Sequence, residues 1–159
     1  AADDPLAGYA ERLEGGELTD SLRGFLTGSI DLVVRRHLPG GGQRFVLIDF
    51  KTNRLGGDDE ALSAWHYRPA ALAEVMGQGH YHLQALLYTV ALYRYLRWRL
   101  PDADPAAHLG GVAYLFVRGM TGPDTPRVAG QPCGVFAWHP PTPLVAELSQ
   151  LLDTAGARQ

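Results

Sequence analysis

The chain has 159 residues, of which 46% are hydrophobic and 19% charged, and its formal net charge is −3. This length fits a single domain with a sizeable core, and the composition is that of a globular protein. The negative charge excludes a simple DNA-coating protein, which would show a basic footprint. It does not exclude a metal-dependent nuclease, because metal-binding carboxylates lower the formal charge until the metal binds.

Signals for membranes, export and disulfides are absent from the sequence. No apolar run reaches the roughly 18 residues that a membrane-spanning helix needs. The first ten residues, AADDPLAGYA, lack the basic and apolar regions of a signal peptide. The single cysteine, Cys133, excludes an internal disulfide and fits a reducing compartment. The chain starts abruptly without Met, so we expect it to be a piece of a longer protein.

The first half of the chain predicts a β-hairpin and a long loop. Apolar and β-branched residues make 24–34 a predicted strand, and the Gly-rich sequence LPGGGQ at 38–43 predicts a turn. A second strand, RFVLIDFKT at 44–52, is expected to be buried on both faces around positions 46–48. The two strands should pair antiparallel, and residues 53–68 should form a mobile loop.

Two helices follow in the sequence. Residues 68–79 predict a short helix closed by Gly77 and Gly79, and residues 81–100 predict the longest helix, which Pro101 stops. The long helix carries an apolar stripe at helical spacing: Leu83, Leu86, Leu87, Val90 and Ala91.

The end of the chain predicts two strands and a final helix. Strands are expected at 110–119 and 133–139, a loop at 121–126 between them, and a helix at 142–153. Thr142 is a plausible N-cap of this helix, with Pro143 at its first position. The order ββααββα predicts an α/β fold in which helices pack on a mixed sheet.

Lys51 is the only lysine in the chain, since all 13 other basic residues are arginines. Side chains alternate along a strand, so Asp49 and Lys51 point to the same face, and the carbonyl of Phe50 lies between them. Asp31 lies on the preceding strand, where antiparallel pairing could bring it near Asp49. The alternative is a surface ion pair between Asp49 and Lys51, with Asp31 an ordinary residue at the edge of the hairpin.

Two carboxylates that lie close together repel each other unless a cation lies between them. Oxygen ligands select Mg²⁺, Ca²⁺ or Mn²⁺, and such a metal can bind a phosphate oxygen and activate a water molecule. A neighbouring lysine could orient that water or stabilise developing negative charge. Lysine suits this role as a compact charge on a flexible stem, whereas arginine is planar and larger.

The long helix supplies two further polar candidates. Gln84 and Tyr88 lie on one helical face at i and i+4, with Tyr81 and Tyr95 at spacings of seven from Tyr88. Gln84 and Tyr88 could bind phosphate oxygens or hold the lysine. The alternative is that these aromatic residues belong to the core.

Four blocks occur in an order that resembles a known family: GSIDLVV, LIDFKTNRLG, YHLQALLYTVALYRYLRWRL and GGVAYLFVRGM. They resemble the C-terminal nuclease domain of the RecB family, the beta subunits of exodeoxyribonuclease V, which belongs to the PD-(D/E)XK, restriction-endonuclease-like superfamily. The resemblance runs from about residue 24 to 120 and is weaker to the end. It implies a restriction-endonuclease-like mixed β-sheet flanked by α-helices. Residues 1–159 would form a single partial domain, with its core at 24–139 and a C-terminal helix at 142–153.

The resemblance also implies residue roles. Asp31 and Asp49 match the two metal-binding aspartates of the family, and Phe50 would offer its backbone carbonyl to the metal. Lys51 matches the catalytic lysine. Gln84 and Tyr88 match the Q-x-x-x-Y motif on the helix of this nuclease group.

Two features of the family are not found. A metal-binding histidine and a glutamate precede the GxID block in the family, but no histidine precedes Asp31 here. Glu11, Glu14 and Glu17 do precede it, in a Gly-rich context that does not match. This implies an N-terminally truncated nuclease domain. The metal affinity and activity of the chain by itself would then depend on how much these missing residues contribute.

The function that the resemblance implies is a Mg²⁺-dependent exodeoxyribonuclease, with Mn²⁺ or Ca²⁺ as substitutes for Mg²⁺. It would cleave single- and double-stranded DNA ends during recombinational double-strand break repair, together with RecC-like and RecD-like subunits in the bacterial cytoplasm. No G-x-x-x-x-G-K-[ST] loop occurs, so an ATP-driven motor would lie elsewhere. The alternatives are a non-catalytic DNA-binding or subunit-docking module on the same fold, and an unrelated structural domain.

Several other residues have two interpretations each. Arg54, Tyr81, Gln84 and Tyr88 are candidate DNA contacts. The arginines at 94, 97 and 99 could meet a DNA backbone or stabilise the C-terminus of their helix. The sequence WHYRP at 65–69 could dock a partner, stack on a base or anchor a loop. Of the histidines, His80 and His82 are expected to be solvated, and the others structural or at the surface.

Overall fold

The structure is a computed structural model that describes residues 8, 11, 14–15 and 27–156. The start of the first expected strand, 24–26, and the upstream Glu17 lie outside the described residues. The element order from residue 27 onward is two strands, two helices, strands again and a final helix, as expected. Among the described residues, no helix combines the length and apolar character needed to cross a membrane.

The first two strands form the predicted antiparallel hairpin. β1 (Leu32–His37) pairs with β2 (Gln43–Lys51), beginning with Leu32 opposite Ile48. The turn has positive φ angles at three consecutive glycines, 40 to 42, which glycine adopts at little cost. The strand was expected to begin at residue 24, but it begins at Leu32. Before that point the Asp31 carboxylate, not a strand carbonyl, accepts the hydrogen bond from the Phe50 N–H.

β1 and β2 lie at one side of a four-stranded mixed sheet with the order β1-β2-β3-β6. β3 (Leu109–Phe116) runs parallel to β2, and β6 (Val135–Trp138) runs antiparallel to β3. The third strand was expected to reach residue 119, but it ends at Phe116 and continues as the short 3₁₀ helix η3 (Val117–Gly119).

The loop expected at 121–126 contains no helix or strand, and a small second sheet follows it. Its two short strands, β4 (Arg127–Val128) and β5 (Gln131–Pro132), pair antiparallel. Two residues per strand are too few for an alternating apolar pattern, so the sequence offered no strand signal there.

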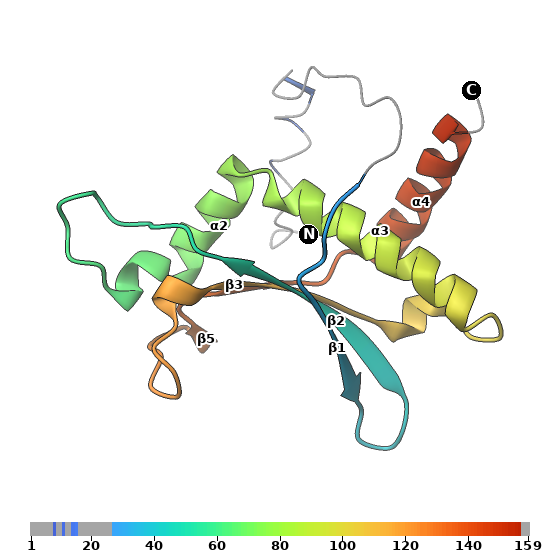
Figure 1. Ribbon diagram of the computed structural model, residues 1–159, viewed down its shortest axis with the longest axis horizontal. Helices are drawn as coiled ribbons and strands as arrows, with labels where there is room; N and C mark the ends of the chain where they lie inside the picture. Colours follow the sequence, from blue (N-terminus) through green and yellow to red (C-terminus); the bar gives the residue numbers. More distant parts are fainter. Residues whose placement is uncertain (1–7, 9–10, 12–13, 16–26, 157–159) are drawn as a thin grey trace.

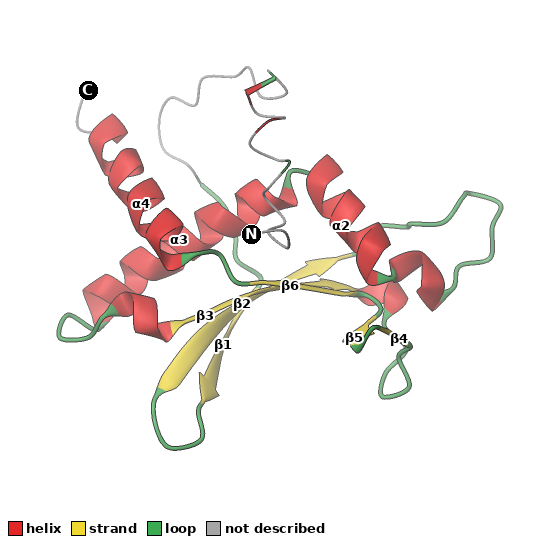
Figure 2. Ribbon diagram, turned by 180° about the vertical axis from the view of Figure 1, so that it is seen from behind, coloured by secondary structure: helices red, strands yellow, loops and turns green. Residues whose placement is uncertain are grey.

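The helices α2 (Pro69–Gln78), α3 (Tyr81–Arg99) and α4 (Thr142–Gly156) lie on one side of the main sheet (Figures 1 and 2). Two short 3₁₀ helices, η1 (Ala64–Tyr67) and η2 (Pro105–His108), precede α2 and β3. Proline at the first position starts α2, as is common for helices. Thr142 was expected to cap the last helix from outside, but the helix already begins at Thr142.

The core lies between the sheet and the helices. Sheet residues alternate, so Leu47, Val112 and Tyr114 face the helical layer and are buried. α3 buries a set of residues that differs from the expected stripe, because this helix contacts the sheet, α2 and α4: His82, Ala85, Leu86, Thr89, Val90, Leu92 and Leu96. Ala91 is exposed.

The opposite face of the sheet is apolar but incompletely covered within the described residues. Leu32, Val34 and Phe50 share this face and are 43%, 39% and 47% exposed. β2 was expected to be buried on both faces around positions 46–48, but only Leu47 is buried there, while Val46 and Ile48 are half-buried. The polar residues at the end of β2 therefore face the helical layer.

Candidate functional site

The site lies at the C-terminal end of β2, on the face that α3 covers. Asp49 and Lys51 share this face, as strand alternation predicted, and the Lys51 Nζ lies 2.7 Å from Asp49 Oδ2. Both side chains are mostly buried, with 13% of Lys51 and 10% of Asp49 exposed. The ion pair of the alternative interpretation is thus present, but it is mostly buried and does not lie exposed at the surface.

Asp31 lies beside this pair, immediately before β1. Its Oδ2 accepts a hydrogen bond of 2.9 Å from the backbone N–H of Phe50, the residue between Asp49 and Lys51. Continuing the β1–β2 register by one step would place Asp31 opposite Asp49. The hairpin therefore brings the two aspartates of the predicted site to the same strand end.

Gln84 is the residue that fixes Lys51 from the helix. Lys51 Nζ donates a hydrogen bond of 3.1 Å to Gln84 Oε1, across 33 residues of sequence. The ammonium group also lies 4.1 Å from the ring centroid of Tyr81, a favourable cation–π arrangement. Of the two roles considered for Gln84, the structure therefore shows a contact with the lysine.

Gln84 is in turn held by two tyrosines. Its Nε2 donates a hydrogen bond of 3.2 Å to the hydroxyl of Tyr88, and its Oε1 accepts a second bond, of 3.1 Å, from the hydroxyl of Tyr114. Burial, together with the negative charge of Asp49, raises the pKa of Tyr114 well above its ordinary value. Tyr114 therefore stays protonated and can donate its hydrogen bond at any physiological pH.

Glycine in the GSID block makes room for this network. A Cβ at Gly28 would lie 3.2 Å from Cε1 of Tyr88, which is tighter than most side-chain contacts. The first and third sequence blocks thus meet at Gly28 and Tyr88. Tyr114 was missed by sequence reasoning, although it lies in the fourth block, because a tyrosine in an apolar strand is usually a core residue.

The oxygen atoms of the site are of the type that binds hard divalent cations. Asp49 Oδ2 is buried and, apart from its ion pair with Lys51, no hydrogen bond reaches it from the described residues. Such an oxygen keeps lone pairs available for a cation, and Asp31 supplies a second carboxylate nearby. Within the described part of the chain, however, no group of three or more His, Cys, Asp or Glu side chains is arranged to hold a metal.

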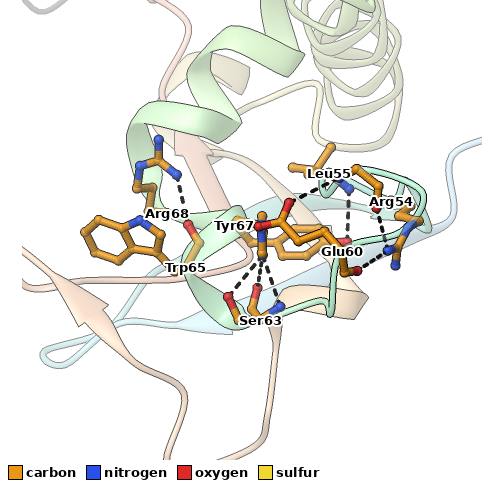
Figure 3. A network of polar contacts seen from close by, with 9 residues as sticks. Arg54, Leu55, Glu60, Ser63, Trp65, Tyr67 and Arg68 are labelled. Carbon is orange, nitrogen blue, oxygen red and sulfur yellow. Dashed lines mark hydrogen bonds and ion pairs between the residues drawn. The ribbon is translucent and has the colours of Figure 1, made fainter.

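The loop that follows β2 is held by its own contacts (Figure 3). Tyr67 is fully buried, and its hydroxyl donates to the Asn53 carbonyl at 2.9 Å. Arg54 donates to the carbonyls of Gly57 and Glu60, so its guanidinium closes the loop. Its contact with DNA stays a prediction. Of the roles considered for the WHYRP sequence, the structure therefore shows that of a loop anchor, which Tyr67 provides.

Two other expectations change with the structure. His82 was expected to be solvated, but it is buried and packs edge-on against Phe136 and Trp138. Its position on α3 faces the sheet, which the helical pattern alone did not reveal. Arg94 was considered for DNA binding, but it donates to Ser149 and Asp153 and so connects α3 with α4.

A mixed α/β fold with an Asp–Lys–Gln cluster at a strand end defines a candidate polar active site. Comparisons with known proteins identify relatives of the chain. The chain is 56% identical over 153 residues to the RecBCD enzyme subunit RecB of Mycolicibacterium smegmatis. It is 56% identical over 152 residues to RecB of Mycobacterium tuberculosis and 38% identical over 148 residues to RecB of Escherichia coli. The chain is therefore a homologue of a segment of RecB.

The matches cover most of this chain but a small part of each relative. They span 96%, 95% and 93% of the chain, yet only 14%, 13% and 11% of the three relatives. No protein-family model matches the chain.

Proposed function

We propose that this chain is the nuclease part of a RecBCD-type helicase–nuclease, with a restriction-endonuclease-like fold, and that it hydrolyses phosphodiester bonds in DNA with the help of Mg²⁺. The observation that carries this proposal is the placement of the single lysine between Asp49 and Gln84. Homology to RecB along 96% of the chain supports it. The buried pair is hard to explain as a stability device, because buried ion pairs seldom stabilise more than apolar residues would.

Asp31 and Asp49 would hold the metal, with the Phe50 carbonyl as a further ligand. Mg²⁺ is preferred because carboxylate and carbonyl oxygens are hard ligands, and Mn²⁺ or Ca²⁺ could replace it. When bound, such a cation supplies positive charge to a phosphate oxygen and lowers the pKa of water. The chain's own residues would then position the substrate and balance its charge.

Lys51 would be the catalytic residue that touches the reacting phosphate or the attacking water. Its ammonium can donate to either, since it has three N–H groups and Gln84 and Asp49 take two of them. Gln84 would be a positioning residue, which limits the rotamers of Lys51 before the substrate arrives. Tyr88 and Tyr114 would hold Gln84 in the orientation that presents its oxygen to the lysine.

The substrate would be DNA ends, single- or double-stranded, that a helicase delivers. We propose that the parent protein works with RecC-like and RecD-like subunits in recombinational double-strand break repair in the bacterial cytoplasm. The relatives are RecB subunits of RecBCD enzymes, which supports this assignment.

The test is metal-dependent cleavage of end-labelled linear DNA by the complete protein that carries this sequence. Lys51→Ala and Asp49→Ala should each lower kcat by roughly 10²-fold or more, as expected for loss of a group that stabilises the transition state. Lys51→Arg keeps the charge but not the compact shape, and it should also be impaired. Cleavage at the wild-type rate by Lys51→Ala would refute the proposed mechanism. Calorimetric titration with Mn²⁺ gives a second readout, because Asp49→Asn should lower the affinity for Mn²⁺.

Gln84 needs a readout that separates positioning from folding. Loss of a hydrogen bond to a charged group is worth about 1.5–3 kcal/mol, so Gln84→Ala should lower kcat roughly 10- to 100-fold. KM should change little, because Gln84 does not touch DNA in this assignment. Gln84→Glu keeps an acceptor for Lys51 and should recover part of kcat. An increase in KM without a decrease in kcat would instead make Gln84 a DNA contact.

A further inference from the structure

The β1–β2 hairpin concentrates positive charge in a chain that is acidic overall. Acidic residues outnumber Lys and Arg in the sequence by 17 to 14, yet residues 32–48 contain no acidic residue. This stretch contains Arg35, Arg36 and Arg44, together with His37. All four side chains are exposed.

The strand register places two of these arginines directly opposite each other. Arg36 pairs with Arg44, so both guanidinium groups extend from the same face of the hairpin. Directly opposed like charges destabilise a pair of strands. Among the described residues, no carboxylate forms an ion pair with either arginine. The pairing is thus unfavourable in this chain, and an anionic ligand would relieve it.

The third arginine faces the same way as the active-site residues. Arg35 pairs with Phe45, and alternation along β2 places Phe45, Leu47 and Asp49 on one face. Arg35 lies four positions after Asp31, which corresponds to about 13 Å along a strand. A nucleic-acid strand that contacts both the arginine and the site would span this distance with a few phosphate groups.

The hairpin has the shape of an arm. Its turn extends away from the helical layer in both views (Figures 1 and 2). Three glycines at the tip carry no side chains, so another chain could approach the backbone closely. No Phe, Tyr or Trp occurs in β1, and Phe45, the Phe of β2 nearest the tip, packs against the core. The arm thus offers charge without a surface on which bases could stack.

We propose that the β1–β2 hairpin binds the phosphodiester backbone of DNA, with Arg35, Arg36 and Arg44 as the contacts. This inference rests on the proposed nuclease function, since it assigns the DNA path next to that site. Arginine binds phosphate through two parallel hydrogen bonds, and DNA presents phosphates in closely spaced rows. Contacts of this kind hold the backbone in register without reading sequence. Arg35 faces the same way as the site and the Arg36–Arg44 pair faces the other way, so the DNA strand would pass along the exposed edge of β1. The hairpin would hold the strand there while its other end carries the reacting phosphate.

The experiment measures cleavage of a short single-stranded and a duplex oligonucleotide by the complete protein, without ATP, over a range of NaCl concentrations. Arg36→Ala/Arg44→Ala should raise KM about tenfold at 0.15 M salt, with kcat nearly unchanged. The slope of log(kcat/KM) against log[NaCl] should become shallower by about two for the duplex, one for each lost phosphate contact. Arg35→Ala should make it shallower by about one. The two substrates tell whether the arm holds single strands, duplex or both.

Two matched variants separate the contact from its alternatives. The double variant Arg97→Ala/Arg99→Ala removes the same charge from the far end of α3 and should leave the slope unchanged. If it changed the slope as much as the hairpin variant does, the effect would come from net charge alone, and the inference would be overturned. Arg36→Lys/Arg44→Lys keeps the charges and should retain most of the salt dependence. Unchanged KM with impaired assembly of the subunits would also overturn it, because the arm would then bind an acidic protein surface.

The outcome also distinguishes failure of the arm from failure of the nuclease. Wild-type cleavage with unchanged KM in the hairpin variants refutes the arm and leaves the nuclease intact. If the wild type cleaves DNA neither without nor with ATP, the nuclease fails, and fluorescence anisotropy of labelled DNA in EDTA then tests the arm. Equal affinity of the wild type and the hairpin variants in that assay would refute it.

Discussion

At the scale of single residues, the site depends on how three kinds of contact converge on one amine. Asp49 supplies the opposite charge, Gln84 an acceptor and Tyr81 a ring face. An ammonium group on a flexible stem can satisfy all three at once, whereas a planar guanidinium would need more room. This explains physically why a chain that otherwise uses arginine has lysine at position 51.

The raised pKa of Tyr114 makes the stability of the protein depend on pH. Its pKa is raised in the folded protein, so the folded state keeps the hydroxyl protonated while the unfolded chain ionises near pH 10. The stability that this group contributes is therefore present below pH 10 and is lost as the pH rises above it. Relative to Tyr114→Phe, the wild type should lose about 1.4 kcal/mol of stability per pH unit above 10.

Urea unfolding of both proteins in EDTA at pH values from 8 to about 11 measures this difference. Tyrosines that do not interact with Tyr114 contribute equally to both proteins and cancel, whereas Tyr81 and Tyr88 interact electrostatically with it. If the free energies of unfolding of the two proteins changed in parallel over the whole pH range, Tyr114 would ionise as easily in the fold as in the unfolded chain.

At the scale of elements, the hairpin and α3 divide the work of the site. The hairpin carries the carboxylates and the lysine at one end and the arginines near the turn. α3 supplies Gln84, which holds the lysine, and Tyr88, which holds Gln84. The arginines near the turn contribute unfavourably to the stability of the hairpin because two of them face each other.

A double-mutant cycle on Arg36 and Arg44 tests this cost. Arg36→Thr and Arg44→Thr should each stabilise the protein, by roughly 0.2–1 kcal/mol at low salt. The double variant should gain less than the sum, because the repulsion is already gone after one substitution. Urea unfolding at low and at 1 M salt is the measurement, and screening should remove most of the coupling at high salt. Coupling of the opposite sign would mean that the two side chains attract or share an anion.

At the scale of the whole molecule, α3 connects the sheet with the C-terminal helix. Its first half meets β2 and β3, and its second half carries Arg94, which donates to the Oγ of Ser149 at 3.0 Å and to the exposed Asp153. Ser149 is almost fully buried, so its polar atoms depend on this contact. The far end of the helix thus holds α4 in place without touching the site.

Arg94→Ala should lower the free energy of unfolding by about 1–3 kcal/mol, because it leaves the Ser149 hydroxyl buried without its partner. Asp153→Ala, which removes only an exposed ion pair, should change it by less than about 1 kcal/mol. Urea unfolding measures both, and kcat should be unaffected in either variant. Equal effects of the two substitutions would show that the ion pair, and not the buried serine, stabilises the contact.

The hairpin, the long helix and the alternation of strands and helices could be predicted because their signals are local. Lys51 beside Asp49 follows from strand alternation, and Gln84 beside Tyr88 follows from helical spacing. The boundaries were less predictable: β1 begins eight residues later than expected, because Asp31 takes over a hydrogen bond that a strand residue would have made. The burial of His82 was also missed, because it depends on which face α3 presents to β6.

The sequence by itself determined which residues of β2 and α3 share a face, and so which polar groups were available to a site. Only the tertiary structure decided that these two sets meet, with Gln84 holding Lys51 across 33 residues and Tyr114 bonding to the same oxygen. The reason is the parallel pairing of β2 with β3, which places Tyr114 beside Asp49 and brings α3 over the strand end that carries both acidic and basic groups. Local periodicity fixes the direction of a side chain, but the packing of distant elements fixes its partner.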